Sequence, residues 1–194
     1  MKPLQTFVAR SHHRGMTMVE VLVTVVILTM GLLPLLQLQT RVQLAGLESY
    51  QRAQALVLLD DMASRLASNR RDAASYATTT GEGATCATSP TTPKDIDISE
   101  WCNALQGAGE TTGTSKLGAM VGGRGCIEGI GNDEYLVTVA WQGLTPIAAP
   151  PDSVACGKGL YNGLIGSNGT TRSPCDNDLC RRTVTTLVRF ATLN

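Results

Sequence analysis

The chain has 194 residues, of which 43% are apolar and only 4% aromatic, and its formal net charge is zero. Its basic residues are unevenly placed, because loss of Lys2, Arg10 and Arg14 would leave 13 basic residues against 16 acidic ones, a net charge near −3. This balance argues against a nucleic-acid-binding protein, which usually has a basic surface. The length allows one or two domains.

Both histidines, His12 and His13, lie in the first fifteen residues. A chain that has lost this segment contains no histidine, so Ser-His-Asp and Cys-His catalysis would lack their base. Zinc sites that need imidazole are excluded in the same way. We therefore expect a protein that is not an enzyme and that has no cofactor or metal.

The stretch RGMTMVEVLVTVVILTMGLLPLLQLQ, residues 14–39, is apolar enough to cross a membrane. Its 21 residues from Met16 to Leu36 are sufficient to span a bilayer. A secretory signal has its small-residue cleavage site after the apolar run, whereas here the small residue, Gly15, precedes it. We expect the apolar segment to be retained and only residues 1–15 to be removed.

A carboxylate, Glu20, lies near the start of this apolar segment. A charge near the centre of a membrane helix costs about 2.5 kcal/mol or more, so a partner is expected. A cut after Gly15 would expose the α-amine of Met16 about one helical turn from Glu20, and this amine is cationic near neutral pH. The alternative is an ordinary signal anchor with Glu20 among the lipid headgroups, and the residues alone leave both interpretations open.

Apolar residues continue at helical spacing beyond the membrane segment. They are Leu35, Leu38, Val42 and Ala45, and then Leu56, Leu59, Ala63 and Leu66, with an interruption at Ser49 and Arg52. The pattern predicts one helix from Met16 to about Asn69, weakened or kinked at Gly31 and Pro34. Residues 16–38 would form its transmembrane half and residues 39–69 its amphipathic half. A membrane anchor followed by a separate helix is the alternative.

Residues 70–194 are predicted to form a β-rich head. Strict alternation predicts strands at Tyr135–Trp141 and Val184–Phe190. A third strand, Cys126–Ile130, would join the first through the turn at residues 131–134. An antiparallel sheet with its apolar face on the helix gives an α+β fold.

Loops and short elements are expected between these strands. Residues 77–93 are small and polar and predict a loop. Residues 98–105 predict a short helix with Asp97 or Ser99 at its cap. Residues 142–180 contain many Pro, Gly and Asn residues, and we expect an ordered surface insertion restrained by disulfides.

All six cysteines follow the apolar segment: Cys86, Cys102, Cys126, Cys156, Cys175 and Cys180. Because the positive-inside rule leaves the basic leader in the cytoplasm, the cysteines would lie across the membrane, in an oxidising compartment where disulfides form. Six cysteines allow many pairings, and the sequence does not choose among them. The run CDNDLC is interpreted as a disulfide-closed turn rather than a calcium loop, since the terminal glutamate of such a loop is missing.

Three other motifs have simple structural interpretations. Asp60 and Asp61 are adjacent on a helix and do not face each other, so an ion pair between Asp61 and Arg65 is expected. Residues 122–125 lack the lysine and serine of a phosphate loop and predict a turn. Residues 168–170, Asn-Gly-Thr, are either a turn or a glycosylation sequon.

Gly15 followed by MTMVEVLVTVVILTMGLL resembles the processing site and N-terminal helix of type IV pilin-like proteins. The resemblance implies that a membrane prepilin peptidase cleaves between Gly15 and Met16 and methylates the Met16 amine. It also implies that Glu20 is the glutamate that directs subunit assembly. One residue departs from the pattern, because Met16 stands where the family usually has phenylalanine. The expected fold is pilin-like, a long N-terminal α-helix packed on a small antiparallel β-sheet with a loop-rich, disulfide-bonded head.

The segments YLVTVAWQG and CRRTVTTLVRF resemble the closing strands of PilV-type minor pilins, the pilus modification group. This resemblance implies a minor pilin that helps to prime type IV pilus assembly and lies at or near the tip. Its partners would be other minor pilins, the major pilin, the prepilin peptidase, the inner-membrane assembly platform and a large tip adhesin. The protein would be a single-pass inner-membrane protein with a periplasmic C-terminal domain before assembly, and part of the surface pilus afterwards. The alternatives are a type II secretion pseudopilin and a membrane-anchored periplasmic enzyme or binding domain.

Overall fold

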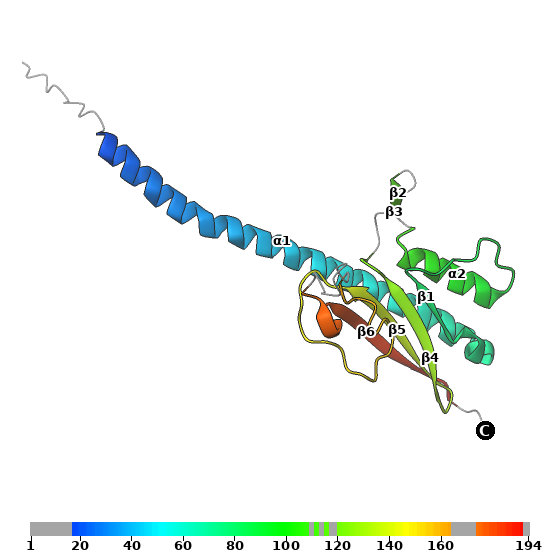
Figure 1. The fold of residues 1–194 in the computed structure, drawn as a ribbon. Coiled ribbons are helices and arrows are strands. Elements are labelled where there is room, and N and C mark those ends of the chain that lie inside the picture. Colours follow the sequence, from blue (N-terminus) through cyan, green and yellow to red (C-terminus); the bar gives the residue numbers. More distant parts are fainter. Residues whose placement is uncertain (1–16, 109–110, 113–114, 117–119, 164–173, 192–194) are drawn as a thin grey trace, which may run out of the picture. The chain divides into compact units, whose positions relative to one another are not determined.

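A computed structural model describes residues 17–108, 111–112, 115–116, 120–163 and 174–191. The chain falls into two units, Met1–Gln43 and Leu44–Asn194. Helix α1, Met18–Ser68, contributes to both, and every other helix and strand lies in the second unit (Figure 1).

In the first unit, α1 begins directly after Thr17, whose hydroxyl oxygen accepts a hydrogen bond from the Glu20 amide at 3.3 Å. The helix runs through Gly31 and Pro34 without a break. The weak point expected there does not end the helix, because good helix formers flank it on both sides. The described side chains up to residue 43 are all exposed. None of the residues that the structure describes therefore buries this apolar segment.

In the second unit, α1 buries one face. The buried residues are Gln51, Ala55, Leu58, Leu59, Met62 and Leu66. Their spacing of three or four residues places them on one side of the helix. They pack against the inner face of a four-stranded antiparallel sheet, so the predicted α+β fold is confirmed.

The sheet has the order β1-β4-β5-β6. Its strands are β1 (Thr78–Gly81), β4 (Arg124–Gly131), β5 (Glu134–Gln142) and β6 (Arg181–Arg189). The predicted turn joins β4 to β5 and has Asn132 at φ 54° and Asp133 at φ 56°. Two consecutive residues with positive φ form the turn whose twist matches a hairpin, and Asn and Asp tolerate this conformation best after Gly.

β5 is buried on both faces, and the sequence interpretation foresaw only the face that meets α1. Val137, Val139 and Trp141 face the α1 side, as their alternation predicts. A second buried cluster lies apart from this core and contains Cys126, Ala140, Cys156 and Tyr161. The segment between β5 and β6 contributes Cys156 and Tyr161 to this second small core, while most of its other described residues up to 163 are exposed.

Two local predictions are wrong. The predicted loop at residues 77–93 contains β1, which pairs with β4 from Thr78↔Ile127 to Gly81↔Arg124. Helix α2 runs from Pro93 to Leu105, and its cap is Thr92 rather than Asp97 or Ser99. The Thr92 hydroxyl oxygen accepts from the Asp95 amide at 3.2 Å, and proline fits the first helical position, where no N–H is needed.

The remaining elements are short. They are the 3₁₀ helices η1 (Arg70–Tyr76) and η2 (Asp176–Asp178), and the two-residue strands β2 (Thr111–Thr112) and β3 (Ser115–Lys116). The turn predicted at residues 122–125 is present at Gly122, and β4 begins at Arg124.

Three disulfides tie the loops of the head to its helices and strands. Cys86–Cys102 connects the segment after β1 to α2, Cys126–Cys156 connects β4 to the segment after β5, and Cys175–Cys180 closes a turn before β6. Their Cα–Cα distances are 5.6, 5.8 and 5.0 Å, which suit disulfide geometry. The expected disulfide-bonded head is confirmed.

Gly125→Ala tests the packing of the head. A Cβ at Gly125 would lie 2.3 Å from the buried Trp101 ring, whereas a Cβ at Gly129 in the same strand would meet Tyr135 at an ordinary 3.7 Å. We expect Gly125→Ala to destabilise the protein by about 1–3 kcal/mol, the usual cost of overpacking. Urea unfolding of the full chain in detergent, with Gly129→Ala as the matched control, measures this difference. Equal stabilities of the two variants would contradict the packing.

Candidate functional site

The predicted processing residues Gly15 and Met16 lie outside the described residues, whereas Glu20 lies in the first turn of α1. The Glu20 carboxylate makes no hydrogen bond or ion pair with any residue that the structure describes. Thr17 and Glu20 have the spacing of a capping box, and a negative charge is favourable at a helix N-terminus. The sequence interpretation overlooked this capping role, although Thr-x-x-Glu before an apolar run is its signal.

The segment that follows Glu20 is long and apolar enough to cross a membrane, judged by length and composition. Its threonine hydroxyls donate to carbonyl oxygens of the same helix, Thr24 to Val21 at 2.8 Å and Thr29 to Val26 at 2.9 Å. These bonds satisfy the hydroxyl donors within the helix, which lowers the cost of placing them in an apolar environment. Glu20 is thus the acidic group of this segment that still lacks a partner among the described residues.

Arg65 is the centre of a charged network at the end of α1. Its guanidinium lies 3.0 Å from Asp61, which confirms the predicted pair, and also contacts Asp97 at 2.9 Å and Glu100 at 2.6 Å. Tyr76 donates its hydroxyl to Asp97 at 2.6 Å. The residues of α2 were not foreseen, because they are more than thirty positions from Arg65 in the sequence. The network joins α2 to α1 and leaves no open pair of carboxylates for acid–base chemistry.

The electrostatics agree with this structural role. Burial lowers the pKa of Arg65, but its hydrogen bonds to Glu100, Asp61 and Asp97 outweigh burial and raise that pKa overall. Burial, reinforced by the hydrogen bond to Asp97, raises the pKa of Tyr76 well above its ordinary value. Arg65 therefore stays charged and Tyr76 stays protonated over the whole physiological range.

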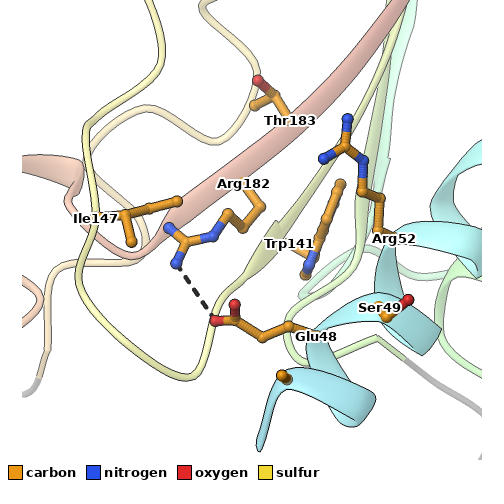
Figure 2. A pocket seen from close by; sticks show the side chains of 8 residues that line it. Glu48, Ser49, Arg52, Trp141, Ile147, Arg182 and Thr183 are labelled. Atoms are coloured by element: carbon orange, nitrogen blue, oxygen red, sulfur yellow. Dashed lines mark hydrogen bonds and ion pairs between the residues drawn. The ribbon is translucent and has the colours of Figure 1, made fainter.

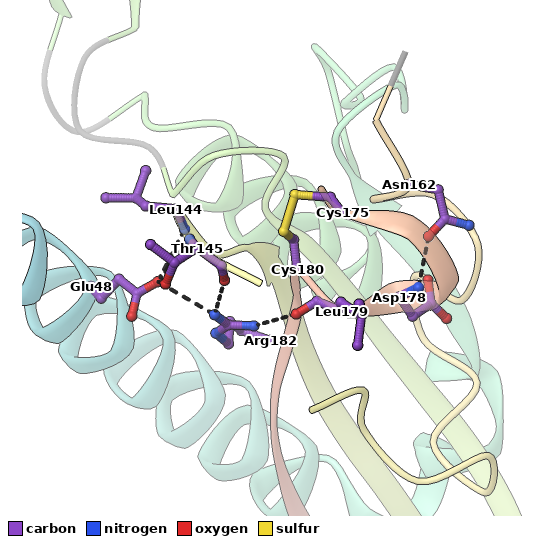
Figure 3. The surroundings of a disulfide bond; sticks show 9 residues. All are labelled: Glu48, Leu144, Thr145, Asn162, Cys175, Asp178, Leu179, Cys180 and Arg182. Atoms are coloured by element: carbon purple, nitrogen blue, oxygen red, sulfur yellow. Dashed lines mark hydrogen bonds and ion pairs between the residues drawn. A yellow bond between two sulfur atoms is a disulfide. The ribbon is translucent and has the colours of Figure 1, made fainter. Parts of the chain in front are cut away.

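The CDNDLC run is a disulfide-closed turn, as predicted (Figure 3). The Asp178 carboxylate accepts from the Gly159 amide at 2.8 Å and lies 3.2 Å from the guanidinium of Arg181. Arg181, whose side chain is 1% exposed, also donates to the carbonyl oxygens of Val154 and Cys156. Among the described residues no group of three His, Cys, Asp or Glu side chains gathers to hold a metal ion. This charge pair fixes the segment between β5 and β6.

A pocket of about 430 Å³ opens between α1 and the ends of β5 and β6 (Figure 2). It is lined by Ala45, Glu48, Ser49, Arg52, Trp141, Ile147, Arg182 and Thr183, all of them in the second unit. The sequence interpretation did not predict this pocket. Its only sign was the polar interruption of the apolar helix pattern at Ser49 and Arg52.

Comparison with known proteins gives one match, to the family described as the prokaryotic N-terminal methylation motif, over residues 10–36. This motif is the prepilin leader with the start of the following helix, and it indicates a type IV pilin-like or pseudopilin-type protein. Proteins of this class are structural subunits rather than enzymes, and the leader with its apolar helix fits anchoring in the inner membrane. No curated protein and no solved structure matches the chain.

Asp97→Asn tests the charged network. Asp97 accepts from Arg65, Asn69 and Tyr76, so the loss of its charge weakens three hydrogen bonds at once. We expect a destabilisation of about 1–3 kcal/mol by urea unfolding, since hydrogen bonds to charged groups are the stronger ones. Asp60→Asn is the control, because Asp60 is exposed and makes no contact of this kind within the described chain. An Asp97→Asn protein as stable as the control would refute the proposed role of the network.

Proposed function

We propose that this protein is a membrane-inserted, non-enzymatic subunit of a type IV pilus. The observation that carries the proposal is the Glu20 carboxylate, which lies at the start of a membrane-length helix, within the matched motif, without a partner in the described chain. Cleavage between Gly15 and Met16 by a prepilin peptidase creates an amine that matches this carboxylate. The amine remains cationic when it is methylated.

In this proposal the amine of Met16 pairs with Glu20 of a neighbouring subunit. Two charges that are each costly in the membrane then neutralise each other, which favours assembly over the separated subunits. The negative charge of Glu20 is also favourable at the start of its own helix. The capping contact there joins the Glu20 backbone amide to the Thr17 hydroxyl, so pairing of the carboxylate between chains leaves it in place. The same residue therefore serves the fold of the helix and the docking of the next subunit.

The finer proposal is a minor pilin of the PilV type that primes assembly and lies at or near the tip. Residues 1–15 are the leader, residues 16–38 the assembly half of the helix, residues 39–69 its amphipathic half and residues 70–194 the head. The three disulfides support a head in an oxidising compartment, the periplasm before assembly and the cell surface afterwards. Its partners are other minor pilins, the major pilin, the assembly platform and a tip adhesin.

A type II secretion pseudopilin is the second candidate, because the matched motif is common to pilins and pseudopilins. The two candidates share the cleavage at Gly15, the amine–carboxylate contact and the anchoring helix. They differ in the filament that contains the subunit. Mass spectrometry of sheared surface pili and of the secretion complex therefore separates them.

Glu20→Ala should prevent incorporation of the chain into filaments while membrane insertion and cleavage continue. The reason is that the new amine of the neighbouring subunit loses its anionic partner. Immunoblots of sheared filaments and membranes measure incorporation, and peptide mapping identifies Met16 as the first residue of the mature chain.

Thr24→Ala is the matched control, because Thr24 lies one turn further along the same helix and its hydroxyl bonds only to its own helix. This variant should incorporate as the unaltered chain does. Normal incorporation of the Glu20→Ala chain, or a mature protein that still begins at Met1, would refute the proposal.

A further inference from the structure

The pocket between α1 and the sheet ends contains one cation that the fold does not use. Arg52 is exposed, and its guanidinium makes no hydrogen bond or ion pair with any residue in the described ranges. Figure 2 shows its side chain directed away from Glu48, whereas Arg182 points toward that carboxylate. The two arginines of the pocket therefore differ in their environment.

The charged groups of Glu48 and Arg182 already have hydrogen-bond and ion-pair partners within the head. Oε1 of Glu48 accepts from the amides of Leu144 and Thr145 at 3.1 and 3.4 Å and lies 3.4 Å from Arg182 (Figure 3). Arg182 also donates to the carbonyl oxygens of Leu179 and Thr145. Since Glu48 balances Arg182, the pocket retains one positive charge, that of Arg52.

The surroundings of this cation are apolar. The pocket wall contains Ala45, Ile147 and the ring of Trp141, which is only 3% exposed. Ile147 is exposed, and a second exposed apolar side chain, Leu144, lies three residues before it. The backbone amide of Leu144 donates to Oε1 of Glu48 at 3.1 Å, which holds Leu144 close to the pocket. A matching ligand has one negative charge and apolar groups around it.

We propose that this pocket receives an aspartate or glutamate side chain of another filament subunit, with its carboxylate on Arg52 and neighbouring apolar side chains on Ile147 and Leu144. This inference rests on the proposed function as a filament subunit. An acidic residue within an apolar protein surface fits better than a small free anion, which would leave the exposed apolar side chains uncovered. A single monoanion matches the one uncompensated charge, and partial desolvation in the pocket strengthens such a pair.

Arg52→Glu tests the inference in the full-length chain in its native membrane. We expect its incorporation into filaments to fall about tenfold, the factor that corresponds to the loss of one interfacial charge pair and its replacement by repulsion. Arg71→Glu is the matched control, because Arg71 is an exposed arginine that makes no polar contact within the described part of the chain. Equal thermal unfolding of the two variants verifies that the head is folded in both.

A photo-crosslinking amino acid at Ile147 identifies the occupant. We expect a crosslink to a pilin-like subunit at a peptide that contains an acidic residue, and we expect Arg52→Glu to remove it. Replacement of that acidic residue by lysine should restore both the crosslink and incorporation in the Arg52→Glu chain. Crosslinks to lipid alone, or no rescue by the charge exchange, would overturn the inference.

The two proposals fail in different ways. If the unaltered chain is absent from filaments, the proposed function is wrong. If the unaltered chain is incorporated and Arg52→Glu is incorporated equally well, only the pocket inference is wrong. Glu20→Ala chains should lose incorporation for the separate reason given above, with the pocket intact.

Discussion

The structure depends on the burial of one face of α1 by the sheet. Only the part of the helix from Gln51 to Leu66 is buried, and its face of Ala55, Leu58, Leu59, Met62 and Leu66 forms the centre of the main core. Trp101 of α2 lies against the same stretch and donates its indole N–H to the Leu58 carbonyl oxygen at 2.9 Å. The first part of the helix has no such partner among the described residues, so its stability depends on its surroundings. One helix thus provides both the central face of the head core and an apolar segment long enough to span a membrane.

The head has few aromatic residues, and its stability depends on the close packing of those it has and on its disulfide bonds. Trp101 fits because Gly125 leaves room for its ring, and Tyr161 closes the second cluster by donating to the Gly122 carbonyl oxygen at 2.7 Å. The Cys126–Cys156 disulfide lies in that same cluster and joins the sheet to the segment that covers it. Because long segments between strands bury little apolar area, crosslinks restrict them where packing alone would not. Disulfides therefore add to two modest apolar cores in holding the head together.

The features that could be predicted from the sequence are those with short-range signals. The helix, the strands β4, β5 and β6, the hairpin turn at Asn132 and the Asp61–Arg65 pair all follow from local spacing, and the structure contains each of them. β1 was missed because its four residues, Thr78–Gly81, are too few to show alternation. The second face of β5, the disulfide pairing and the pocket at Arg52 depend on segments far apart in the sequence, which no local pattern brings together. Thr92 was overlooked for a different reason, since the helix was predicted to begin several residues too late.

The charged residues fall into two groups, those with partners inside the head and those without a partner in the described chain. Arg65, Arg181 and Arg182 each have carboxylate partners, and together they hold α2, the disulfide-closed turn and the segment after β5 in place. An unpaired charge on an open surface is solvated by water and needs no explanation. Glu20 and Arg52 are different, because one lies in an apolar segment of membrane length and the other in a pocket lined by Trp141 and Ile147. A partner of opposite sign that excludes water from such a place gains more there than on an open surface. Glu20 and Arg52 are therefore the two charges of the described chain at which, on the proposals above, another subunit would be bound.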